Sequence, residues 1–152
     1  MSLSPLRRKI HIAQSFSIHD WRLLFRAWLL LLLVDWRLRR GSFASLQVWA
    51  RNIQGDAEVV KPVNAPTIIQ RTRLIVEIAS RRHLYPMSCL RQSLVMQRLL
   101  GSQGLATDLR IGAQHQDGEL RAHAWLEFQG APIGERQEIE ERYRPLEALK
   151  KS

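Results

Sequence analysis

The stretch "SCLRQSLVMQRLL", residues 88–100, contains the only cysteine of the chain. Pro86 interrupts the preceding helical pattern, Ser88 is a favourable N-cap and Gly101 is a favourable stop. The pattern therefore predicts a helix whose first residue is Cys89. A cysteine at this position has two interpretations. It is either a small buried apolar residue or a nucleophile activated by the helix N-terminus.

The composition limits the class of protein. A chain of 152 residues with 45% hydrophobic residues is long enough and apolar enough for one folded domain. One cysteine excludes an intramolecular disulfide and a multi-cysteine zinc site, and the histidines show no ligand spacing, so we expect no metal and no cofactor. The first apolar run has no cleavage site after it, which predicts a cytoplasmic protein. The formal charge of +9 predicts attraction to something acidic: a peptide, a partner protein, an anionic membrane surface or nucleic acid.

Residues 1–60 are predicted to form an amino-terminal helical region. A first helix over 20–40 would have Asp20 as its N-cap and Gly41 as its C-cap, and a second helix is expected over 43–54. The continuous apolar run of the first helix, 27–34, has eight residues. A transmembrane helix is therefore not expected, because about 20 apolar residues are needed to span a bilayer.

Two interpretations of this first helix stay open. In one, the helix is buried on most sides. In the other, its tryptophans and flanking arginines rest on a membrane surface or on a partner protein, which adds a peripheral membrane contact to the cytoplasmic location. The tryptophans are Trp21, Trp28 and Trp36.

Residues 61–152 are predicted to form the rest of the same compact domain. Residues 55–67 have the composition of a loop, and helical periodicity resumes over 67–83. The cysteine helix follows, and after it the pattern indicates an antiparallel sheet whose first turn is Asp117-Gly118. Its strands are expected over 105–113, over 119–128 and around Ile133. The fold class predicted is α+β, with the cysteine helix packed on a small antiparallel sheet.

His123 is the best candidate for a base that activates the thiol. On a strand it shares one face with Trp125 and Glu127, while Ala122, Ala124, Leu126 and Phe128 form an apolar face. Glu127 cannot easily orient His123, because four residues along a strand separate the Cα atoms by roughly 13 Å. Glu135, on the next strand, is the candidate acceptor. It would lie opposite His123 only if the intervening loop has an odd number of residues.

The stretches "CLRQSLVMQRLLGSQGLATDLRIGAQ" and "LRAHAWLEFQGAPIGE" together carry a family resemblance. They resemble the transglutaminase-like cysteine proteases of lasso-peptide biosynthesis, the leader peptidases that release the core peptide from its precursor. The match covers about residues 85–135 in detail. The matching positions are Cys89, Leu90, Ser93, Gly104, Ile111, Gly112, His123, Ala124, Trp125 and Glu127.

The resemblance implies a papain-like order of catalytic residues on a transglutaminase-type core. Cys89 would be the nucleophile, His123 the general base and then acid, and Glu135 the third residue. The family usually has aspartate at the third position. The resemblance also implies hydrolysis of an acyl-enzyme rather than cross-linking, although water and an amine compete for the same thioester.

The family further implies a substrate and partners. The substrate would be a ribosomally made precursor peptide cut at its leader–core junction. A separate winged-helix-like protein would recognise the leader, and a separate ATP-dependent cyclase would close the ring. The chain has no phosphate-cradling glycine loop of its own. Basic residues of the amino-terminal helices would dock the acidic leader or one of these proteins.

Two rival interpretations come from other classes. One is a catalytically idle transglutaminase-like scaffold, which the glutamate at position 135 keeps open. The other is a nucleic-acid binder driven by charge. No zinc finger, aromatic-basic RNA motif or helix-turn-helix pattern supports the second, so we expect no nucleic-acid partner.

Overall fold

The computed structural model describes residues 16–51, 64–84, 86–116, 119–134 and 144–145. The helices are α2 (Ile18–Arg40), α3 (Phe43–Arg51), α4 (Ala65–Arg81) and α5 (Cys89–Gly101). The strands are β1 (Asp108–Gln116), β2 (Glu119–Phe128), β3 (Ala131–Pro132) and β4 (Arg144–Pro145). The predicted α+β class is confirmed.

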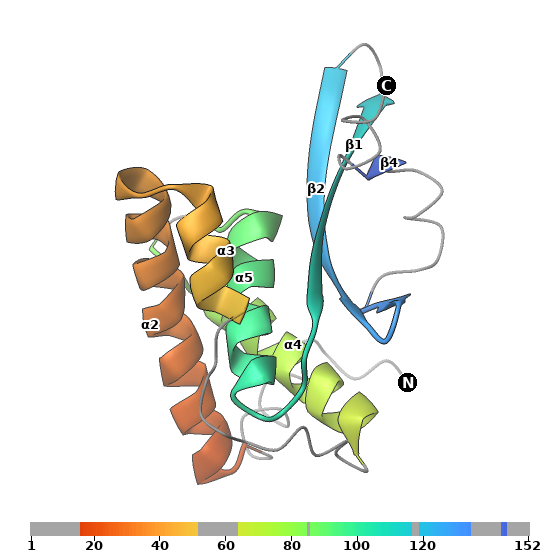
Figure 1. The fold of residues 1–152 in the computed structure, drawn as a ribbon. Helices are drawn as coiled ribbons and strands as arrows, with labels where there is room; N and C mark the ends of the chain where they lie inside the picture. The colour runs from red at the N-terminus through yellow and green to blue at the C-terminus, as the bar shows by residue number, and fades with distance from the viewer. Residues whose placement is uncertain (1–15, 52–63, 85, 117–118, 135–143, 146–152) are drawn as a thin grey trace, which may run out of the picture.

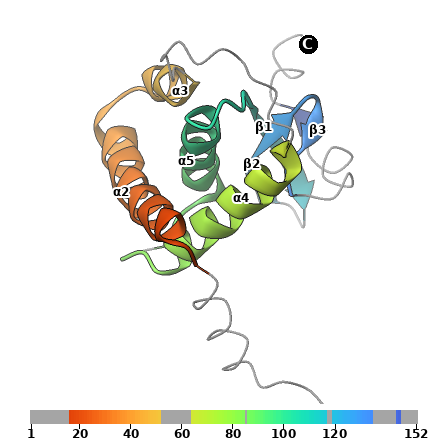
Figure 2. The ribbon, with the colours of Figure 1, turned by 90° about the horizontal axis from the view of Figure 1, so that it is seen from below.

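The helices and the sheet form two layers with α5 at the centre (Figure 1). The sheet is antiparallel, in the order β3-β2-β1-β4. Seen from below, α5 lies between α2 on one side and the sheet on the other, with α4 running beneath both layers (Figure 2). The fully buried side chains of α5 are Leu94, Val95, Leu99 and Leu100. The cysteine helix is therefore the element around which the domain packs.

The N-cap of helix α2 lies three residues before the predicted one. Ser17, not Asp20, is the N-cap, and the two form a capping box in which each side chain accepts from the other's backbone N–H. The Asp20 carboxylate also pairs with Arg71 of α4, and this hydrogen bond lowers the pKa of Asp20 to about 2. Gly41 is the C-cap, as predicted. None of the helices in the described part of the chain is long and apolar enough to cross a membrane.

Helix α4 begins inside the stretch predicted to be a loop. Ala65 is its first residue and Pro66 its second, a position where proline is tolerated because the first N–H groups of a helix have no intrahelical acceptor. Helix α3 is described as far as Arg51, and its predicted end at residue 54 lies outside the described residues. The predicted boundary between the two regions falls within 52–63, outside the described residues, so the division at residue 60 stays a prediction.

An ion pair joins α5 to α2 on the side away from the sheet. Asp35 of α2 is buried and lies 2.7 Å from the Arg91 guanidinium and 2.9 Å from that of Arg39. Arg91 is only two residues after Cys89, so this pair fixes the first turn of α5 against α2. Removing one partner of such a pair leaves a buried charge without compensation.

The sheet is close to the one predicted. Strand β2 has the predicted bounds, and the register pairs Gln116 with Glu119 across a two-residue connection at the predicted hairpin position. Strand β1 begins and ends three residues later than expected. Ile133 lies one residue beyond β3, but its N–H donates to the Leu126 carbonyl at 2.8 Å and so continues the pairing with β2.

Candidate active site

Cys89 is the first residue of α5, as the sequence predicted, and it is half-buried. Ser88 has the extended backbone of an N-cap, with φ −67° and ψ 158°, but its side chain makes no capping hydrogen bond. The first-turn N–H groups of a helix have no intrahelical acceptors, and the helix dipole adds positive potential at this end. A thiolate, or an oxyanion formed beside it, would be stabilised at this position.

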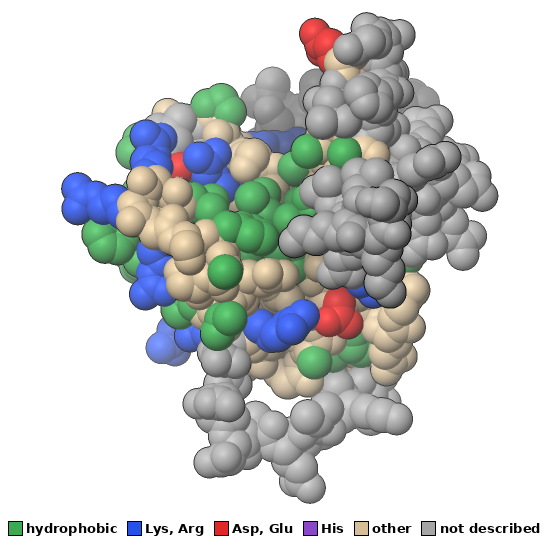
Figure 3. All heavy atoms as spheres, turned by 45° about the horizontal axis from the view of Figure 1, so that its top comes forward, with side chains coloured by type: hydrophobic (Ala, Val, Ile, Leu, Met, Phe, Trp, Pro, Cys, Tyr) green, Lys and Arg blue, Asp and Glu red, His purple; other side chains and the backbone are tan. Residues whose placement is uncertain are grey.

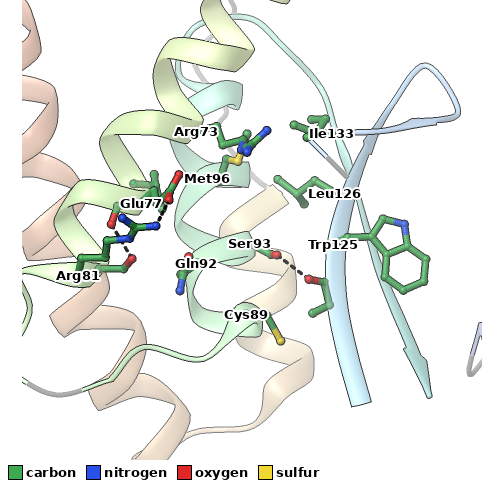
Figure 4. Close-up of a pocket in the computed structure, with 14 residues that line it drawn as sticks. Arg73, Glu77, Arg81, Cys89, Gln92, Ser93, Met96, Trp125, Leu126 and Ile133 are labelled. Carbon is green, nitrogen blue, oxygen red and sulfur yellow. Dashed lines mark hydrogen bonds and ion pairs between the residues drawn. The ribbon is translucent and has the colours of Figure 1, made fainter. Parts of the chain in front are cut away.

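A cavity of about 410 Å³ opens beside Cys89, between α4, α5 and the β2–β3 end of the sheet (Figure 4). Its wall from α4 is largely polar, and its wall from the rest of α5 and the sheet is largely apolar. Further lining residues come from all three elements and from the segment after β3: Ser80, Gln92, Ser93, Ala124, Trp125 and Gly134. The polar wall contains Arg73, Glu77 and Arg81, and the apolar wall contains Met96, Leu126 and Ile133.

Of the two described arginines on the α4 wall, Arg81 has an ion-pair partner among the described residues and Arg73 has none. The Arg81 guanidinium donates to the Glu77 carboxylate at 2.5 Å, within the same helix. Arg73 makes no ion pair with any described residue, and its side chain lies so close to Gly134 that a Cβ there would clash with it. The cavity thus has a cation at the end formed by Ile133 and Gly134, with the thiol at the other end.

Helix α5 and strand β2 run side by side in the same direction (Figure 1). The Ser93 hydroxyl donates to the Ala124 carbonyl at 3.2 Å and joins the two elements. Cys89 precedes Ser93 by one helical turn, about 6 Å, and His123 precedes Ala124 by one strand residue, about 3.4 Å. The turn that carries the thiol is therefore level with the backbone segment that carries His123.

The His123 side chain, however, is on the other face of β2. Ala124 and Leu126 face the helices and belong to the core, and Figure 4 shows the Trp125 ring on the far side of the strand from Cys89. The His123 ring stacks on that of Trp125, with centroids 6.1 Å apart and an interplanar angle of 16°. His123 is not among the described residues that line the cavity. The structure brings the His123 backbone to the thiol but not its imidazole.

Glu127 is occupied by other partners, in agreement with the expectation that it does not orient His123. Its buried carboxylate accepts from the Arg110 guanidinium at 2.9 Å and from the Trp125 indole N–H at 3.4 Å. Arg110 is the cross-strand neighbour of Trp125 on β1. These three side chains form a polar layer on the outer face of the sheet. The described residues contain no group of three or more His, Cys, Asp or Glu placed to hold a metal ion.

The comparison with known families decides what kind of domain this is. Residues 30–148 match the family model described as "Transglutaminase-like superfamily", which covers well over half of the chain. The chain belongs to the transglutaminase-like superfamily. Domains of this superfamily are commonly cysteine proteases or transferases. No curated protein and no solved structure matches the chain significantly.

The third predicted residue of this transglutaminase-like domain, Glu135, lies outside the described residues. The turn that leads towards it has two residues, Gln129 and Gly130, at φ 54° and 79°, and Phe128 pairs with Ala131. The odd-numbered loop that would place Glu135 opposite His123 is therefore absent.

Sequence reasoning missed the α4 wall of the site. Arg73, Val76, Glu77 and Ser80 follow the spacing i, i+3, i+4 and i+7, which puts them on one face of α4. That face was visible in the sequence, but nothing local showed that it would meet Cys89. Gln92 was also missed. It lines the cavity, and its side-chain amide donates to the Met87 carbonyl at 2.9 Å. This hydrogen bond joins the segment before α5 to the first turn of the helix.

Proposed function

We propose that this chain is a cysteine peptidase that removes the leader from a ribosomally synthesised lasso-peptide precursor. The observation that carries the proposal is the position of Cys89, at the N-terminus of a central helix and at one end of a cavity large enough for peptide side chains. The motif resemblance around Cys89 and His123 supports the choice of substrate class. The superfamily supports the choice of thiol chemistry.

The proposed reaction has two halves. His123 takes the proton of the Cys89 thiol, and the thiolate attacks the carbonyl carbon of the leader–core bond. The first-turn N–H groups of α5 stabilise the oxyanion. The carbon–nitrogen bond breaks, the imidazolium gives its proton to the departing amine of the core, and the leader remains as a thioester. Water, deprotonated by His123, then hydrolyses the thioester to the leader carboxylic acid and the free thiol.

This reaction needs the His123 imidazole on the inner side of β2. Catalytic hydrogen bonds are often long or misaligned without substrate and tighten when it binds. The His123 backbone is already level with the thiol, but the backbone of a strand fixes the face to which each Cβ points, so the proposal requires the β2 backbone at His123 to turn the ring to the inner side. We propose Glu135 as the residue that orients the ring in that arrangement.

A separate leader-recognition protein and an ATP-dependent cyclase are the proposed partners. The chain carries a formal charge of +9, which favours an acidic leader or an acidic partner surface. We propose that the reaction takes place in the cytoplasm. Arg73, at the far end of the cavity from the thiol, is then the cation best placed to contact an acidic leader residue.

The outward position of His123 favours one second candidate, a catalytically idle scaffold that assembles the other enzymes. An idle domain would keep Cys89 and its cavity without a base beside the thiol. The two candidates differ in one measurable outcome, which is whether the leader–core bond is cut.

The test is mass spectrometry of a leader–core precursor incubated with this chain and a separate leader-recognition protein. Cys89→Ala is the matched control, since it removes only the sulfur. Cleavage at one junction that is lost in Cys89→Ala supports the peptidase. An intact precursor, with all proteins folded and bound to one another, would support the scaffold instead.

A further inference from the structure

Helix α2 is apolar on two opposite sides. Ala27, Leu31 and Val34 are fully buried against the domain. A second set of large hydrophobic side chains faces away from the domain at a helical spacing of three, four, four and seven residues. We call this set the outer stripe: Ile18 (72% exposed), Trp21 (53%), Phe25 (63%), Leu29 (44%) and Trp36 (52%).

A helix that is apolar all round is normally covered all round, because exposed apolar area costs roughly 25 cal/mol per Å². Single exposed hydrophobic residues need no explanation, but a continuous line of them along one helix marks a contact surface. From Ile18 to Trp36 the outer stripe covers 18 helical steps, about 27 Å. It runs almost the whole length of α2.

The exposed charges on α2 are positive, which indicates an acidic partner. Its two carboxylates, Asp20 and Asp35, are buried and paired with arginines, so neither contributes to the exposed surface. The exposed charged residues beside the outer stripe include Arg22, Arg26 and Arg40. The Arg40 guanidinium lies 5.4 Å from the centre of the Trp36 ring. Arginine side chains, with hydrophobic ones among them, also project from the side of the molecule where α2 lies, at the left of Figure 3.

We infer that the outer stripe docks on an anionic phospholipid bilayer, with α2 lying in the plane of the headgroups. Three features fit a membrane better than a protein. The stripe lies on the convex surface of one helix, which a flat bilayer accepts without a matching groove. Tryptophans stand near both of its ends, where the indole ring suits the headgroup region. Arginines flank it, and each is attracted to an anionic lipid surface.

This orientation leaves the candidate active site accessible. Seen from below, α2 and the sheet lie on opposite sides of α5 (Figure 2). Docking through the outer stripe therefore turns the sheet, and the end of the cavity formed by β2 and Ile133, away from the bilayer. The inference does not depend on the proposed peptidase activity, because membrane binding is measured without any substrate.

The test is sedimentation of the full-length protein with vesicles. One set contains equal parts of phosphatidylglycerol and phosphatidylcholine, and the other contains phosphatidylcholine alone. The variant is Phe25→Asp combined with Leu29→Asp. The control is Leu74→Asp, which places one of the two added charges at an exposed leucine of α4 instead of on the outer stripe. We expect wild type and Leu74→Asp to bind the anionic vesicles equally, the double variant to bind at least tenfold more weakly, and binding to phosphatidylcholine alone to be at least tenfold weaker.

The folding of each variant is checked by its circular-dichroism melt, and because the altered side chains are exposed, the melts should match that of wild type. No binding of the wild-type protein to anionic vesicles would overturn the inference, as would equal binding by the double variant. Light scattering adds one more decisive outcome. A wild-type dimer that the double variant dissociates would show that a second copy of the chain, rather than lipid, covers the outer stripe.

Discussion

The two faces of β2 have different neighbours and different chemistry. On the inner face, Ala124 and Leu126 pack into the core against α5. On the outer face, His123 stacks on Trp125, and Trp125 and Arg110 share the Glu127 carboxylate. One face packs against the helices, and the other buries the Trp125 ring beside the hydrogen-bonded Glu127 carboxylate, although consecutive residues of one strand supply both.

From this difference we expect that substitutions in β2 can change the free energy of unfolding and the rate of cleavage separately. Substitutions on the inner face should lower the free energy of unfolding, and removal of the His123 imidazole should lower the rate of cleavage. The peptidase proposal adds the requirement that His123 leaves its place beside Trp125 to reach Cys89. The predictions below separate these effects.

The largest effect is expected for His123→Ala. Removing a general base typically costs 10²- to 10⁴-fold in rate, so we expect kcat for precursor cleavage to fall by roughly 10³-fold. The melting temperature should change little, because His123 is half-buried and outside the core. Cleavage kinetics beside a thermal melt make the comparison. Full activity in His123→Ala would remove His123 from the mechanism.

The inner face should give the opposite result in Leu126→Ala. Leu126 is 3% exposed and belongs to the core, and truncation of a buried leucine leaves a cavity that costs roughly 2–4 kcal/mol. Urea denaturation measures this loss. In the folded fraction, the rate of cleavage per molecule should fall less than in His123→Ala, because Leu126 lines the cavity wall but takes no part in proton transfer. An equal loss of activity in both variants would contradict the separation of the two faces.

The helical layer that supports the inner face should respond to acid through Asp20. Its folded-state pKa of about 2 is below the ordinary 3.8, so the Asp20–Arg71 pair stabilises the folded state above about pH 4. This stabilisation, on the order of 2 kcal/mol, is lost as the pH falls from about 4 to about 2. Asp20→Asn should therefore be less stable than wild type at pH 6 and nearly equal to it below pH 2. A difference that is the same at both pH values, measured by urea denaturation, would contradict this assignment.

The smallest effect is expected at the glycines that follow β2. Gly134 has φ +72° and a Cβ there would clash with Arg73, whereas Gly130 has φ +79° and open space around it. Both alanine substitutions should cost about 1 kcal/mol in left-handed strain. Only Gly134→Ala should also displace Arg73 from the cavity wall and weaken binding of an acidic peptide. Equal effects on peptide binding would show that Arg73 does not depend on Gly134.

The parts of the fold predicted well are those with strong local signals. Pro86 and Ser88 fix the start of α5 at Cys89, and the alternation of residues 119–128 after an Asp-Gly pair fixes β2. These features need no tertiary information, because capping, helix breaking and strand alternation act within a few residues of the chain.

The errors arose where two local signals compete. Ser17 and Asp20 are both favourable caps, and the capping box uses both, so the helix starts at the first of them. The composition of residues 55–67 predicts a loop, although Pro66 is compatible with the first turn of α4. Gln129 adopts a positive φ that is unusual for a residue other than glycine, and the two-residue turn it forms could not be distinguished from a three-residue loop.

The composition of the cavity could not be predicted from local signals at all. Cys89 and its helix position were predicted, but the α4 wall depends on how a helix distant in sequence packs against α5. The same limitation applies to His123. The alternation of β2 showed which residues share its face, but only the position of the sheet shows that this face points away from the thiol.

The measurement that tests the central claim most directly traps the acyl-enzyme. The precursor, the recognition protein and this chain are incubated with hydroxylamine, which competes with water for a thioester, and the products are identified by mass spectrometry. The account predicts a leader hydroxamate with the wild-type chain, none with Cys89→Ala, and a strongly reduced amount with His123→Ala. Cleavage that yields only the leader acid, or hydroxamate formed equally by Cys89→Ala, would contradict a thioester at Cys89.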